Sequence, residues 1–246
     1  MMRLSRIRFT FLFIFPALFA VLLGTGALTY SSFLTLIAEY NLDQWECRGT
    51  VSDDGEWQTQ AENLNQAKKI EQFDANVSLD LGRLHEFRAL SKPIWSDDAK
   101  ISRKQSLDYY QEATTQRPTW ALAWVNVAQA RLLNQQIDKE TFDAMRKAFQ
   151  YGRWQEKVQQ RLIWLGVGMW SVLPVDLKDE IRAVVRQTLE QDYRVYGLIV
   201  LAYRQKWEGE LKKLVTRKEH WEIIRRIEKN GNELNEYLRK QQARKC

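Results

Sequence analysis

The first forty residues constrain this chain more than any other part of it. Three arginines within the first eight residues precede a run of 30 positions, Phe9 to Ala38, that carries no charged residue. A helix of about 20 apolar residues crosses the core of a bilayer, and a helix satisfies its own backbone hydrogen bonds in lipid. Pro16 does not argue against this, because membrane helices tolerate proline. We therefore predict a cytoplasmic stub and transmembrane helix at 1–40, which contacts the lipid bilayer from Phe9 to Ile37.

The charges on either side of this segment predict its orientation. Arginines precede it, whereas Glu39, Asp43 and Glu46 follow it. Because positive residues stay on the cytoplasmic side, we expect a cytoplasmic N-terminus. In a Gram-negative bacterium the helix would then be single-pass in the inner membrane, with the C-terminal domain in the periplasm. The alternative is a cleaved signal peptide with its cleavage site near Thr25-Gly26-Ala27. We favour the retained anchor, because apolar residues resume after that site.

The remainder of the chain has the pattern of an all-α protein. Residues 41–56 mix turn-forming and charged residues, so we expect a linker there. In 57–207 apolar residues recur at helical spacing, as in Val77, Leu81 and Leu84, and no useful strand-like alternation occurs. The sequence therefore predicts an N-terminal single transmembrane helix followed by a helical-hairpin domain at 57–207.

Residues 208–246 form a basic tail that we expect to be helical. The whole chain carries a net charge of +6, and from Arg204 onward thirteen Lys and Arg face seven Glu, so the central part is mildly acidic. Three interpretations stay open: a solvated helix, a surface for an acidic polymer or lipid headgroups, and an apolar stripe that packs on a partner protein. Nucleic acid is not an expected partner of an exported domain. Cys47 and Cys246 either pair or stay free thiols.

The segment from Ser106 to Leu133 has the residue pattern of tetratricopeptide repeats, which are helix pairs of about 34 residues. Small residues in such repeats let helices approach closely, and aromatic residues fill the gap between successive pairs. The positions of this pattern are occupied by Gly82, Tyr110, Ala113, Pro118, Trp124, Val127 and Ala128. We therefore expect tetratricopeptide-like packing over about two repeats, with a general helical bundle as the alternative.

The wider stretch at 106–202 resembles one family in particular. Its segments SLDY, PTW, AWVNVA, AFQYGRW, GVGMW and LKDEIRAVV are similar to the VpsP-type proteins of bacterial exopolysaccharide and capsule gene clusters. Members of that family are small single-span proteins with an exported tetratricopeptide-like part. The resemblance implies an accessory role in making, polymerising or exporting a surface polysaccharide. The basic tail departs from the pattern of the family.

No motif of a catalytic or metal-binding site is recognisable in the sequence. Walker A, G-x-S-x-G and dinucleotide-binding patterns do not occur. His85 and His220 lie in separate predicted helices, without the spacing of metal ligands. Acidic pairs such as Asp97-Asp98 stand at predicted helix starts, where carboxylates stabilise the helix dipole. We therefore expect a protein that is not an enzyme and holds neither a metal nor a cofactor.

Aromatic and basic residues supply the candidate binding surface. Tryptophans cluster between positions 120 and 170, and at helical spacing they are expected to fill a core; those at helix starts are the exceptions. The candidate surface consists of Trp120, Trp124, Trp154, Lys212, Lys213, Arg225 and Arg226. We expect an anchored scaffold that binds protein components of a polysaccharide assembly machine. The alternative is a carbohydrate-binding module that holds anionic polysaccharide through these tryptophans and the basic tail.

Overall fold

The computed structural model describes residues 2–49, 51 and 53–229, and within them the all-α prediction is confirmed. These residues form eleven helices and no strand. In chain order the helices are α1 (Met2–Arg48), α2 (Asp54–Ile70), α3 (Ala75–Ser91), α4 (Asp97–Gln116), α5 (Ala121–Leu133), α6 (Lys139–Gly152), α7 (Glu156–Gly168), α8 (Val175–Leu189), α9 (Asp192–Arg204), α10 (Glu208–Lys212) and α11 (Lys218–Lys229).

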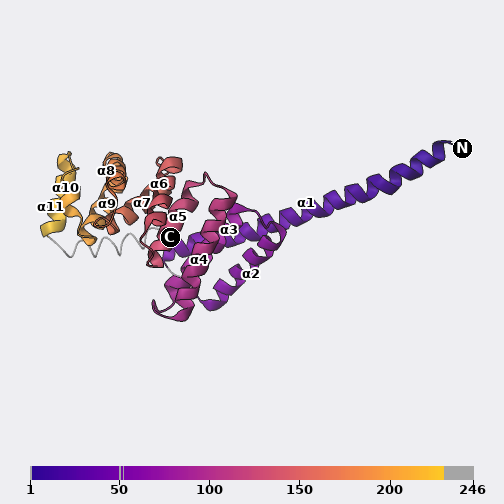
Figure 1. Ribbon diagram of the computed structural model, residues 1–246, viewed down its shortest axis with the longest axis horizontal. Helices are drawn as coiled ribbons and strands as arrows, with labels where there is room; N and C mark the ends of the chain where they lie inside the picture. The colour runs from indigo at the N-terminus through magenta and orange to yellow at the C-terminus, as the bar shows by residue number, and fades with distance from the viewer. Residues whose placement is uncertain (1, 50, 52, 230–246) are drawn as a thin grey trace.

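Successive helices pair as hairpins and stack into an elongated array, from which α1 projects at one end (Figure 1). Glycines mark two of the closest crossings. A Cβ atom on Gly82 of α3 would lie 2.4 Å from the Tyr110 ring of α4, and one on Gly166 of α7 would lie 2.4 Å from Ile181 of α8. Only a residue without a side chain fits at these two crossings. Gly82, expected to be a small residue at a close approach between helices, does lie at such an approach, against the ring of Tyr110.

Side-chain caps mark the starts of several helices, among them α4 and α6. The Ser96 hydroxyl accepts a hydrogen bond from the backbone N–H of Ala99 at 3.2 Å, and the Asp138 carboxylate accepts one from Thr141 at 3.1 Å. Each of these bonds satisfies one of the N–H groups that the first turn of a helix leaves unpaired. Ser96 and Asp138 thus set where α4 and α6 begin.

α1 consists of two different halves. From Pro16 to Tyr30 it touches almost nothing. The helix from Pro16 to Arg48 is long enough and apolar enough, by length and composition, to cross a membrane. From Ser31 onward it buries one residue every three or four positions against α2 and α3, namely Ser31, Leu34, Ala38, Leu42 and Trp45. That spacing is one stripe of a helix. A single helix therefore joins the apolar segment to the folded domain.

The linker predicted at 41–56 is wrong over most of its length. Residues 41–48 continue α1, α2 begins at Asp54, and only residues 49–53 connect the two helices. Asn41 and Asp43 are turn-forming residues, but burial of Leu42 and Trp45 outweighs their weak local preference. The domain thus begins inside the N-terminal helix.

The separate tail predicted at 208–246 is also wrong as far as residue 229. Leu211, Leu214 and Ile224 are buried in the same core as α5–α9, together with Trp207. The apolar stripe of this segment packs on α9 of its own chain. The rest of this tail, residues 230–246, lies outside the described residues, and so does the pairing of Cys246.

Candidate functional site

Among the residues that the structure describes, a groove runs along α3, α5, α7 and α9. It is made of three adjoining cavities of about 140, 160 and 340 Å³. Lys157 and Arg161 line both the first and the second cavity, and Gln160 and Trp164 line both the second and the third. Because each cavity shares lining residues of α7 with the next, the three form one continuous groove.

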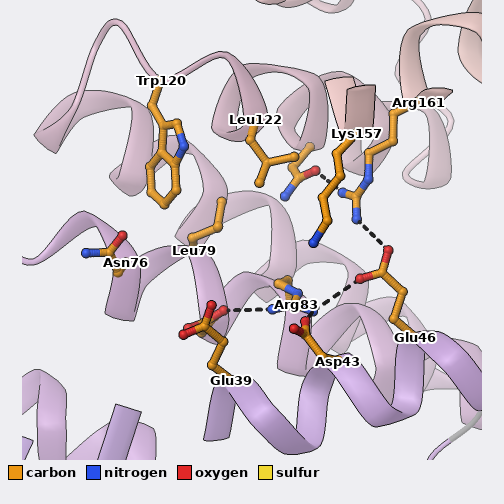
Figure 2. Close-up of a pocket in the computed structure, with 12 residues that line it drawn as sticks. Glu39, Asp43, Glu46, Asn76, Leu79, Arg83, Trp120, Leu122, Lys157 and Arg161 are labelled. Carbon is orange, nitrogen blue, oxygen red and sulfur yellow. Dashed lines mark hydrogen bonds and ion pairs between the residues drawn. The ribbon is translucent and has the colours of Figure 1, made fainter. Parts of the chain in front are cut away.

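One end of this groove is closed by α1. Figure 2 shows the acidic side of α1 turned toward cations of α3 and α7. Arg83 lies 2.5 Å from the carboxylate of Asp43 and 3.2 Å from that of Glu46, while Arg161 lies 3.4 Å from Glu46. Arg161 also donates a hydrogen bond to the side chain of Asn126 on α5. Ion pairs therefore hold the acidic face of α1 against α3 and α7, and Arg161 ties α7 to α5.

A buried carboxylate lies beneath these ion pairs. Asp80 is almost fully buried and lies 3.2 Å from Arg83. Burial raises the pKa of Asp80 to about 6, although the Arg83 guanidinium opposes the shift; Glu39 and Asp43 add to it. Burial lowers the pKa of Arg83, but its carboxylate partners raise that pKa further, so the guanidinium stays charged. Arg83 thus holds the closed end together.

The other end of the groove, between α7 and α9, is open. Trp164 is 40% exposed and Tyr193 is 72% exposed, and both line the largest cavity with Ile163 and Leu201. Arg194 is buried at its base and donates a hydrogen bond to Gln159 at 2.9 Å. Aromatic rings beside an apolar floor and a few polar groups are typical of surfaces that bind protein segments. The open end therefore has the chemistry of a binding site.

The three predicted tryptophans lie apart from one another. Trp120 lines the closed end of the groove. Trp124 is half-buried, donates a hydrogen bond to the carbonyl of Pro118 at 2.7 Å and lies 3.8 Å beneath the Lys147 ammonium. Trp154, in the turn after α6, is 67% exposed and lines none of the three cavities. Only Trp120 therefore belongs to the groove.

The four predicted basic residues lie on α10, its C-terminal end and α11, at the end of the array opposite α1 (Figure 1). Lys212 forms an ion pair with Glu228 at 2.7 Å, and Lys213 pairs with Glu210 at 2.6 Å. Arg225 and Arg226 are exposed on α11. The seven predicted residues do not gather into one surface.

Sequence reasoning missed the residues that form the open end. Trp164 was expected in the core with the other tryptophans, and that expectation is wrong. Lys157, Gln160, Arg161 and Trp164 recur at the spacing of one helix face, opposite the buried stripe of α7. This polar and aromatic face of α7 was the sequence feature that could have identified the groove. Tyr193 and Arg194 carry no such signal, because their role depends on the packing of α9 beside α7.

Titratable residues elsewhere do not form a second site of this kind. Within the described part of the chain, no three His, Cys, Asp or Glu side chains gather as metal ligands. His85 and His220 are both buried, His85 between Tyr109 and Trp57. A comparison with protein-family models finds no match to this chain, and neither does a comparison with curated protein sequences. The groove is therefore interpreted from its own geometry.

Proposed function

We propose that this protein is a membrane-anchored, non-enzymatic adaptor that binds a partner protein in the groove along α5, α7 and α9. The apolar half of α1 supports the anchor, because nearly all of its side chains from Pro16 to Tyr30 are exposed and suit lipid rather than water. The open end of the groove supports the binding function. The two features together make α1 an anchor for a binding surface.

The observation that carries this proposal is the way the groove already holds one helix. α1 lies at the closed end with its carboxylates on Arg83 and Arg161. The open end continues the same surface past Lys157 to Trp164 and Tyr193. A partner segment that continues along it needs apolar side chains for the aromatic residues and a carboxylate for Lys157. We therefore propose an amphipathic, acidic helix as the bound segment.

The cellular setting is proposed from the sequence alone. The arginines before α1 support a cytoplasmic N-terminus and a periplasmic domain in a bacterial inner membrane. The resemblance to VpsP-type proteins supports a role in an exopolysaccharide or capsule assembly machine. The stacked hairpins support tetratricopeptide-like packing, and arrays of that kind bind partners on an extended concave surface.

The test is capture of a partner by variants of the full-length chain in cross-linked membranes. Replacing Trp164 and Tyr193 together by alanine should lower capture of defined partner proteins at least roughly tenfold, since aromatic residues at the centre of an interface carry most of its binding energy. The matched control is Trp154→Ala, an exposed tryptophan outside the groove. Equal capture by the double variant and the wild type would contradict the proposal.

The same capture in cells that make no surface polysaccharide separates the two kinds of partner. An adaptor keeps its protein partners in those cells. A carbohydrate-binding module, which would use Trp120, Trp124, Trp154 and the basic residues of α11, would lose them. Loss of all partners in polymer-free cells would therefore replace the adaptor function with the carbohydrate-binding alternative.

A further inference from the structure

The place where α1 leaves the folded domain is marked by two contacts with α2. The Tyr30 hydroxyl donates a hydrogen bond to the Gln66 side chain at 3.0 Å, and the Ser31 hydroxyl donates one to the carbonyl of Ala67 at 3.4 Å. From Pro16 to this point α1 packs on almost nothing. The surface of the bilayer therefore lies close to residue 30, if α1 is the anchor proposed above.

α2 runs antiparallel to α1 and points back toward this boundary. Trp45 bonds to Glu56 at the start of α2, whereas Tyr30 bonds to Gln66 near its end. α2 continues four residues beyond Gln66, to Ile70, which is about 6 Å at 1.5 Å per residue. Figure 1 shows α2 converging on α1 at the end of the array from which α1 projects. The turn between α2 and α3 therefore lies beside the apolar part of α1.

This turn presents one large apolar side chain to its surroundings. Phe73 is 87% exposed, the highest value for any large apolar residue among those the structure describes. Ile70 is partly exposed beside it, and Lys69 is exposed at the end of α2. Exposing a phenylalanine to water costs on the order of 2 kcal/mol relative to burying it in an apolar environment. Ile70 and Phe73 therefore form an apolar tip of the turn, flanked by the charged residues Lys69, Glu71 and Asp74, which suit the headgroup region of a bilayer.

Local contacts hold the turn in place. The Lys68 ammonium donates hydrogen bonds to the Gln72 carbonyl at 2.7 Å, to Ser78 at 2.8 Å and to Glu112 at 2.7 Å. The Asp74 carboxylate accepts a hydrogen bond from the backbone N–H of Asn76 and so caps α3. Because the backbone on both sides of Phe73 is fixed, its exposed ring is a property of the fold.

We propose that the turn from Ile70 to Asp74 is a second membrane contact, with Phe73 inserted among the phospholipids of the bilayer that α1 crosses. The inference rests on the membrane anchor proposed above. One helix crossing a bilayer leaves the domain free to tilt about it, and a second contact removes that freedom. The open end of the groove, at α7 and α9, is then held at the side of the domain remote from the bilayer (Figure 1).

The test places a photoreactive benzoylphenylalanine at single positions of the full-length chain in nanodiscs of phosphatidylethanolamine and phosphatidylglycerol. Position 73 tests the turn, and position 22 tests the apolar half of α1. Position 95 is the matched control, because Trp95 is 71% exposed in the turn after α3. α3 spans 17 residues, so the two turns are about 25 Å apart. Thermal unfolding of each variant reports whether it folds as the wild type does.

Lipid adducts, measured by mass spectrometry after illumination, are expected at positions 22 and 73, with at least tenfold fewer at position 95. Adducts at position 22 without adducts at position 73 would overturn the second contact and leave the anchor intact. Equal numbers of lipid adducts at positions 73 and 95 would also overturn the second contact, because the domain would then have no fixed orientation relative to the bilayer. Absence of adducts at position 22 would overturn the anchor itself. Cross-links from position 73 to protein in place of lipid would assign the turn to a protein interface.

Discussion

Two ionisable residues of α3, Asp80 and His85, are buried five positions apart and have pKa values shifted in opposite directions. Burial raises the pKa of the Asp80 carboxyl to about 6. Burial also lowers the pKa of the His85 imidazole to about 4, and Arg88 adds to that shift. In both cases burial disfavours the charged form, which is an anion for Asp80 and a cation for His85.

The two shifts have opposite consequences for stability. Asp80 binds its proton more tightly in the folded state, so its contribution falls as pH rises from about 4 to about 6. His85 binds its proton less tightly in the folded state, so stability falls as pH decreases from about 6.5 to about 4. Each effect is about 3 kcal/mol at full extent. In the wild type the two largely cancel across this interval.

Single substitutions should expose each effect. We expect the free energy of unfolding of Asp80→Asn to rise between pH 4 and pH 6.5 by up to about 3 kcal/mol relative to the wild type, because only the His85 effect remains. We expect that of His85→Gln to fall relative to the wild type over the same interval. Urea unfolding of the detergent-solubilised full chain at several pH values measures both. Parallel pH profiles for the three proteins would contradict the assignment.

The residue patterns predicted contacts within a helical hairpin better than contacts between hairpins. The small position at Gly82 and the aromatic position at Tyr110 were identified from sequence, and their contact is seen. Both belong to the same helix pair, and a repeat pattern describes one pair. Trp164 was misassigned to the core because its exposure depends on how α7 lies beside α5 and α9. Spacing along one helix does not contain that information.

At the scale of the element, α1 combines two environments in one helix. The uncharged run predicted a helix, and that prediction is confirmed. Its end was placed at residue 40 because the composition changes there, but the buried stripe continues to Trp45. The composition of a helix indicates whether its surroundings are apolar or aqueous. The length of α1, in contrast, is set by its packing on α2 and α3. The sequence therefore did not show that residues 31–48 pack in the core of the domain.

The stripe on α1 should contribute strongly to the stability of the domain. Leu42 is fully buried, whereas Leu36, on the same helix, is 63% exposed. We expect Leu42→Ala to lower the free energy of unfolding by about 2–5 kcal/mol, because it leaves a cavity between α1 and its neighbours. The control, Leu36→Ala, should change it by less than about 1 kcal/mol. Urea unfolding of the full chain in detergent micelles compares them; equal losses would show that α1 does not belong to the core.

At the scale of the whole molecule, the groove follows from the stacking of hairpins. Four helices from different parts of the sequence contribute to the groove, and α1, the first helix of the chain, closes one end of it. The helical class could be predicted because each helix carries its own periodicity. The groove could not, because its residues are up to about 160 positions apart and are joined only by the stacking. The tetratricopeptide and polysaccharide assignments stay predictions.

The central claim is that one continuous helix crosses the membrane and then enters the core of the domain. Hydrogen-exchange mass spectrometry of the full chain in phospholipid nanodiscs tests it most directly. We expect slow exchange from residue 9 through residue 48, because lipid protects the first part and packing on α2 and α3 protects the second. Rapid exchange over residues 31–48 would contradict this account. So would a mature protein that begins near residue 28, because the N-terminal segment would then be a cleaved signal peptide.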